Sequence, residues 1–231
     1  MFDGVRPWLG VARTLDSLNR LSADRKLQTE SGKPVRFVPP GAKDAYYELK
    51  VFHTGEVETR PDNLHDFFNA LAWLAFPRSK ARLNALHAAE IPREGGRRGR
   101  LRDLLTIFDE GGAIVLCNDA LLLRLLRNFE WKALFWEQRE RVRTEMRIVV
   151  FGHAVMEQAL NPWSGITCKA IVAPADASID AVTQAWLGAL QPGASPRDLA
   201  PLPIFGYPGW SAQDEAFYDD ARYFRPFRAN G

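Results

Sequence analysis

The spacing of apolar residues predicts alternating helices and short strands. Residues 8–22 carry leucine and valine at intervals that suit one amphipathic helix. Residues 33–41 read as a short edge strand, because two prolines stop it. The runs 46–52 and 56–60, separated by a His-Thr-Gly segment at 53–55, predict a β-hairpin.

The next segment predicts two consecutive helices. Asn63 is expected to cap a helix over 64–76, with Asp66 giving a start that resembles a capping box. This helix is apolar nearly all round, which predicts that it is buried. Pro77 ends or kinks it, and a more exposed helix follows over 78–90.

The clearest hairpin signal lies at 101–117, where Asp-Glu-Gly-Gly separates two apolar runs, 101–108 and 113–117. Further helices are predicted over 120–129, 131–145, 153–160 and 177–190, and further strands over 146–151 and 166–173.

Together these elements predict an α+β fold, with a small mixed or antiparallel sheet made from hairpins and packed by several helices. We expect a single domain over 1–231. In it, 1–44 give an N-terminal helix and edge strand, 45–200 the core, and 201–231 an extended wrap rich in aromatics, proline and glycine. The many large apolar groups of this last segment need burial, so it is expected to be ordered.

Composition narrows the class of protein. Hydrophobic residues make up 46% and charged residues 25%, as in ordinary globular proteins. Two distant cysteines favour reduced, buried thiols, and the N-terminus lacks the pattern of a signal peptide. No apolar run approaches the roughly 20 residues that span a bilayer. We therefore expect a cytoplasmic protein with no membrane partner. The absence of P-loop, dinucleotide-binding and nucleophile-elbow motifs counts against those enzyme classes.

Two histidine-centred groups occur where core helices are predicted to begin. His65, Asp66 and Asn69 start one helix, and His153 and Glu157, four residues apart, share a face of another. These side chains can hold a divalent metal ion or activate water, as in a metal-dependent hydrolase acting on phosphodiesters. His65, His153 and Glu157 are then the candidate ligands. The alternative is that these side chains cap helices and satisfy buried backbone groups.

Four other acidic residues are candidates with simpler explanations. Asp109 and Glu110 fall at the expected hairpin tip, where turns favour Asp for conformational reasons. Asp219 and Asp220 can supply oxygen ligands or pair with neighbouring arginines.

Two hypotheses without catalysis also follow from the sequence. A basic region predicts binding to nucleic acid or an acidic protein, with solvated helix and loop surface as the alternative; its candidate residues are Arg78, Lys80, Arg82, Arg97, Arg98 and Arg100. An exposed apolar patch around Tyr207–Trp210 would instead indicate a structural or assembly partner.

Several blocks of the chain resemble a bacterial family known as domain-of-unknown-function family 3025. They are Tyr47-Glu48, Gly55, Thr59-Arg60, 65–84, 102–110, 151–160, 165–169, 201–210 and 217–226. This resemblance implies no activity. The order of hairpin and helix over 46–76 also resembles the ββα-metal nucleases, although His53 lies at the expected turn and not at the end of the first strand.

Overall fold

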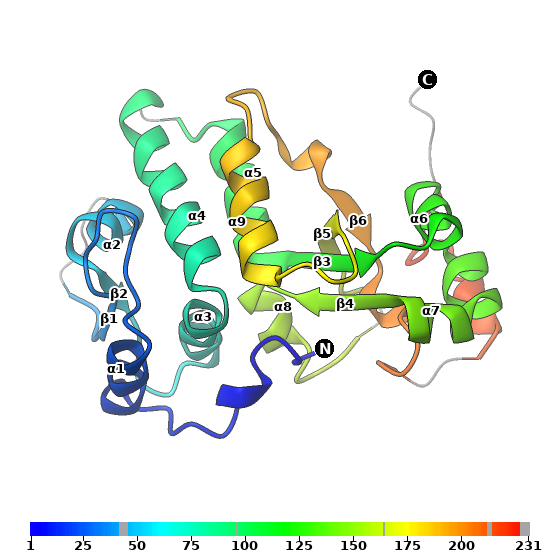
Figure 1. Cartoon of the computed structure of the whole chain (residues 1–231), viewed down its shortest axis with the longest axis horizontal. Coiled ribbons are helices and arrows are strands. Elements are labelled where there is room, and N and C mark those ends of the chain that lie inside the picture. The colour runs from blue at the N-terminus through cyan, green and yellow to red at the C-terminus, as the bar shows by residue number, and fades with distance from the viewer. Residues whose placement is uncertain (42–45, 96, 164, 212–213, 227–231) are drawn as a thin grey trace.

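A mixed four-stranded sheet and a two-stranded sheet are surrounded by helices in the computed structural model (Figure 1), which describes residues 1–41, 46–95, 97–163, 165–211 and 214–226. The α-helices are α1 (Leu15–Asp24), α2 (Tyr47–Thr54), α3 (Leu64–Ala75), α4 (Pro77–Glu90), α5 (Arg100–Gly111), α6 (Ala120–Arg127), α7 (Arg139–Glu145), α8 (His153–Gln158) and α9 (Ile179–Ala189). The strands are β1 (Arg36–Val38), β2 (Glu56–Glu58), β3 (Gly112–Cys117), β4 (Met146–Val150), β5 (Cys168–Ala173) and β6 (Ala200–Leu202). The predicted α+β class is confirmed.

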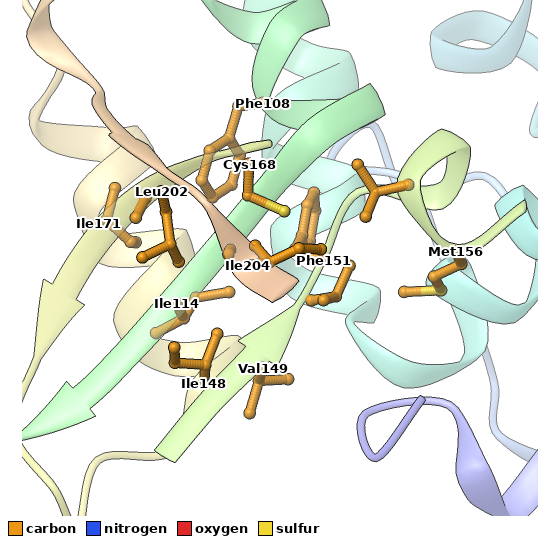
Figure 2. Packing of buried hydrophobic residues seen from close by; sticks show 14 of the residues in the cluster. Phe108, Ile114, Ile148, Val149, Phe151, Met156, Cys168, Ile171, Leu202 and Ile204 are labelled. Atoms are coloured by element: carbon orange, nitrogen blue, oxygen red, sulfur yellow. The ribbon is translucent and has the colours of Figure 1, made fainter. Parts of the chain in front are cut away.

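The larger sheet has the order β4-β3-β5-β6, with β3 parallel to β5 and antiparallel to β4. All six residues of β3 are buried, as expected of a central strand covered on both faces. Ile114, Val149 and Leu202 from three different strands lie together in this core (Figure 2). In Figure 1, α4, α5 and α9 stand at the end of the sheet where β3 begins, and α6 and α7 lie at the other end.

The predicted hairpin over 101–117 is wrong, because its first half is the helix α5. Leu101, Leu104, Leu105 and Phe108 are all buried and share one face at helical spacing. The Gly-Gly pair ends the helix instead of forming a turn. A Cβ on Gly112 would lie 2.4 Å from the carbonyl oxygen of Phe108, so glycine lets β3 start directly against α5.

The predicted hairpin over 46–60 is also wrong. Its first run forms α2, which ends at Gly55 in the left-handed conformation, with φ of 76°. The second run forms β2, which pairs in parallel with β1 and not with the preceding segment. The ββα order that resembled the metal nucleases is therefore absent from this region.

Several element boundaries differ from those predicted. The first α-helix begins at Leu15 behind a Thr14 cap, while Arg6–Trp8 form a separate 3-10 turn. The predicted helix over 131–145 is divided into a π-helical turn (Ala133–Glu137) and α7. In α3, Asn63 caps the helix as predicted, because its side chain accepts a 2.9 Å hydrogen bond from the backbone N–H of Asp66.

The C-terminal segment is built into the core as well as wrapped around it. Its strand β6 extends the sheet, and Phe205, Tyr218 and Phe224 are buried. The Tyr223 hydroxyl donates to the carbonyl of Ile166 at 2.7 Å and so ties this segment to the start of β5. Residues 201–211 and 214–226 thus pack against the rest of the chain, while 212–213 and 227–231 lie outside the described residues.

Cys117 and Cys168 are both buried free thiols, as predicted. None of the helices in the described ranges has the length and apolar character needed to cross a bilayer.

Candidate metal centre

Three helix ends meet beside the start of β3. His65 lies in the first turn of α3, Glu110 in the last turn of α5, and His153 is the first residue of α8. Gly152 allows this meeting, because a Cβ there would lie 2.5 Å from backbone atoms of Gly111. The chain leaving β4 therefore passes directly against the end of α5 and places His153 beside Glu110.

The three side chains direct ligand atoms at one point. The Nε2 atoms of His65 and His153 are 3.1 Å apart. An oxygen of Glu110, Oε2, lies 3.8 Å from Nε2 of His65 and 3.5 Å from Nε2 of His153. Together they form a group whose ligand atoms can reach one metal ion.

The size of this triangle suits a small divalent ion. A triangle with sides of 3.1, 3.5 and 3.8 Å has its centre about 2.0 Å from each corner, which matches zinc–ligand distances of about 2.0–2.2 Å. A tetrahedral ion at about 2.1 Å would separate its ligands by about 3.4 Å. The side chains of His65 and Glu110 keep 33% and 41% of their surface exposed, so the group is accessible from solvent.

Each imidazole has a carboxylate on its other nitrogen. Oε2 of Glu157 lies 3.1 Å from Nδ1 of His65, and Oδ2 of Asp109 lies 3.9 Å from Nδ1 of His153. The contact of Glu157 with His65 favours the tautomer of His65 that carries its proton on Nδ1. Nε2 of His65 is then free to act as an electron-pair donor, whereas Nδ1 of His153 is buried without a hydrogen-bond partner among the described residues.

Burial keeps one of these ligands neutral. The pKa of His153 is lowered to about 4, chiefly because the ring is taken out of water, and Asp109 opposes this only in part. A neutral imidazole is the form that binds a metal ion. The pKa of Glu110 is raised by burial and by the nearby charge of Asp109, so a cation at the centre would favour its ionised form.

A second polar cluster lies behind Asp109. The Lys80 side chain is only 4% exposed, and its Nζ donates to Asp109 at 2.5 Å and to Asn69 at 2.9 Å. Burial would raise the pKa of Asp109, but Lys80 and His153 more than offset this and hold it below its ordinary value. We call this group, with Glu48 and Asn84 beyond it, the Lys80 cluster. It borders a cavity of about 20 Å³, enough for about one water molecule.

The predicted site residues divide into two groups. His65 and His153 meet, although the sequence separates them by 88 positions. Asp66 faces elsewhere: it accepts bonds of 2.8 Å from both the backbone N–H and Nε of Arg60. Asn69 binds Lys80. Neither Asp66 nor Asn69 reaches the centre formed by the imidazoles.

The predicted ligand role of Glu157 does not fit the geometry. Its carboxylate lies on the Nδ1 side of His65, whereas His153 meets the opposite nitrogen. Glu110 occupies the ligand position instead. Sequence reasoning placed Asp109 and Glu110 in a turn, but the helical spacing of the leucines before them would have put both at a helix end.

The predicted basic surface loses a central member, because Lys80 is buried. Two of its arginines are already paired, Arg82 with Glu30 at 3.2 Å and Arg98 with Asp103 at 2.9 Å, as is the neighbouring Arg102 with Glu94 at 2.7 Å. Arg78, Arg97 and Arg100 are exposed. Binding of nucleic acid or an acidic protein through these residues stays a prediction.

The predicted acidic and aromatic alternatives are also placed. Asp219 pairs with Lys132 at 2.9 Å, and Asp220 with Arg222 at 3.3 Å. Tyr207 and Trp210 are partly buried against the core, and an assembly partner at this segment stays a prediction.

Comparison with known proteins places the chain in a family. Residues 35–228 match a family described as a protein of unknown function, DUF3025. The chain belongs to this family. The DUF3025 match spans α3, α5 and α8, so it includes all three ligand-bearing elements. No curated protein and no solved structure matches the chain significantly.

Proposed function

We propose that this protein is a metal-dependent hydrolase whose ion is held by His65, Glu110 and His153. The observation that carries the proposal is the triangle of two imidazole nitrogens and one carboxylate oxygen with a common centre about 2.0 Å from each atom. Two imidazoles and one carboxylate, with a fourth position left for water, form a ligand set used by catalytic zinc.

The same donor types also hold iron in oxygen-activating enzymes. The ligand spacing favours the zinc-like alternative: its mean is close to the value of about 3.4 Å expected for tetrahedral geometry, whereas octahedral ligands at similar bond lengths lie about 3.0 Å apart. A bound ion of this kind acts as a Lewis acid and lowers the pKa of a bound water to about 7.

The chain supplies the positioning groups for this chemistry. Glu157 would orient the His65 ring through Nδ1, which lies 3.1 Å from its carboxylate. The guanidinium of Arg60 is held by Asp66, which raises its pKa, and Glu157 adds to this shift. The Arg60 side chain is 57% exposed, so an anionic substrate such as a phosphodiester would share it with Asp66.

The first test is metal content in protein purified without a histidine tag or chelator. We expect about one zinc-like ion per chain in the wild type and little in His65→Ala, Glu110→Ala or His153→Ala. His53→Ala, which removes an exposed imidazole from the end of α2, is the matched control and should retain the ion.

Activity measurements then distinguish a hydrolase from an oxygen-activating enzyme. With the ion bound, the wild type should hydrolyse bis(4-nitrophenyl) phosphate, and His153→Ala should not. Iron binding with oxygen consumption and no hydrolysis would assign the centre to oxygen chemistry instead. Failure to bind zinc, manganese or iron at micromolar concentrations would overturn the metal centre itself.

A further inference from the structure

A second pocket, of about 780 Å³, lies against β5 and β6 and contains none of the metal-centre residues. Its size falls within the range of small-molecule sites. The described residues that line it are Trp131, Trp163, Gly165, Thr167, Lys169, Pro201, Pro203, Asp220, Arg222, Tyr223 and Arg225.

The pocket carries an excess of positive charge. Lys169, Arg222 and Arg225 line it, against one carboxylate, Asp220. That carboxylate is already engaged, because Nε of Arg222 and the backbone N–H of the same residue both donate to Asp220 Oδ1, at 3.3 and 3.0 Å. The described lining therefore offers cations to a ligand and no unpaired anion.

Among these three cations, Lys169 most clearly lacks an anionic partner. It is half-buried on β5, and burial lowers the pKa of its amine. Its hydrogen bond is a long one, 3.4 Å from Nζ to the backbone carbonyl of Leu199, and no carboxylate of the described residues pairs with it. This contrasts with Lys80, which has Asp109 at 2.5 Å.

The lining of the pocket also includes an aromatic side chain that is largely exposed to solvent. Trp163 is 60% exposed, the largest value among the large apolar residues of the described ranges. A Cβ on Gly165 would lie 1.6 Å from the indole, so the ring lies directly on the glycine backbone. The other aromatic groups have structural roles: Trp131 Nε1 donates to the Arg225 carbonyl at 2.8 Å, and the Tyr223 hydroxyl binds Ile166.

We propose that this pocket binds a nucleotide, with its phosphate paired to Lys169 and its base stacked on Trp163. A phosphate supplies the anion that Lys169 lacks, and Arg222 and Arg225 line the same pocket. A base supplies a flat ring for the open indole, a contact that contributes measurably to binding in many nucleic-acid proteins. A simple anion would leave the indole uncovered.

Calorimetric titration with adenosine monophosphate tests this site, with adenosine and inorganic phosphate as the partial ligands. We expect the nucleotide to bind and each partial ligand to bind at least tenfold more weakly. Lys169→Met should weaken binding of the nucleotide at least tenfold. Lys33→Met, which removes the same charge from an exposed position, should bind as the wild type does.

Two further variants separate the base from the phosphate. Trp163→Ala should weaken the binding of adenosine monophosphate but leave the binding of inorganic phosphate unchanged. Gly165→Ala should have a similar effect, because the added methyl displaces the indole without removing it. Circular dichroism checks that each variant is folded.

Repeating the titration with His153→Ala checks that the nucleotide does not bind at the proposed metal centre. This variant should bind the nucleotide as the wild type does. A single-stranded oligonucleotide that binds more tightly, with steep salt dependence, would identify the nucleotide as part of a strand. The proposal is overturned if millimolar adenosine monophosphate gives no binding heat, or if Lys169→Met and Trp163→Ala bind it as the wild type does.

Discussion

The metal centre and the Lys80 cluster meet at Asp109 but differ in how their polar groups are matched. In the Lys80 cluster a donor faces acceptors: the ammonium of Lys80 contacts oxygens of Asp109 and Asn69. At the candidate metal centre two imidazole nitrogens and a carboxylate oxygen converge within 3.8 Å, and these are atoms that can hold a metal ion. One cluster thus contains its own cation, and the other is the one to which we assign the proposed ion.

The largest expected effect on stability comes from removing the ammonium group of Lys80. Lys80→Met leaves Asp109 as a buried charge without its partner, so we expect a loss of about 3–5 kcal/mol in the free energy of unfolding, measured with urea. The double variant Lys80→Met/Asp109→Leu should recover much of that loss, because it removes both charges. Exposed Lys33→Met should change stability by less than about 0.5 kcal/mol.

A loss below about 1 kcal/mol for Lys80→Met would show that Asp109 finds another partner or takes up a proton, and the contrast between the clusters would fail.

Binding of a zinc ion at the proposed metal centre should stabilise the folded chain. With zinc at about 100 times its dissociation constant, the free energy of unfolding should rise by about 2.7 kcal/mol, since only the folded chain brings the three ligands together. Thermal unfolding with and without a chelator measures this. His153→Ala should show no difference, whereas a shift of equal size in that variant would place the ion elsewhere.

These clusters also show what the sequence could predict. The two histidines were identifiable because each stands at the start of an apolar helix, where a polar side chain needs a partner. Their meeting was not predictable, because α3 and α8 are brought together by tertiary packing. The same packing places Glu157 beside Nδ1 of His65 and Glu110 beside the two Nε2 atoms.

The errors in secondary structure have a common physical cause. At 109–112 and at 53–55, a glycine-containing segment predicts a hairpin turn, whereas in the structure Gly112 and Gly55 end helices. Glycine suits both uses, since a left-handed residue is needed at Gly55 and a close approach at Gly112. The helical spacing of Leu101, Leu104 and Phe108 is the stronger signal, and it places Glu110 at a helix end, although only tertiary packing brings it to His153.

The support of His65 is a smaller test of the metal centre. Glu157→Ala should weaken metal binding about 10–100-fold without abolishing it, because the ring loses its orienting partner but keeps its ligand atom. Glu157→Gln should retain most of the affinity, since its amide oxygen can accept the same bond from Nδ1. Competition with a fluorescent zinc chelator measures both. Complete loss of metal in Glu157→Gln would make Glu157 a ligand, as the sequence first indicated.

The smallest expected effect concerns Glu48, at the far side of the Lys80 cluster. Burial raises its pKa from 4.5 to about 7, although Asn84 donates to its carboxylate at 2.6 Å. The folded chain therefore holds this proton more tightly than the unfolded chain does. Its contribution to stability is full below about pH 4.5 and is lost as the pH rises through about 7.

Glu48→Gln should remove this pH dependence, because the amide stays neutral throughout. Relative to the variant, the wild type should lose about 1–2 kcal/mol of unfolding free energy between pH 6 and pH 8. The difference between the two urea-unfolding curves isolates Glu48, because every other ionisable group is the same in both proteins. Glu140→Gln, whose side chain is 77% exposed, should give a flat difference. A flat difference for Glu48→Gln as well would mean that the Lys80 cluster holds Glu48 ionised, so that its lysine balances two carboxylates.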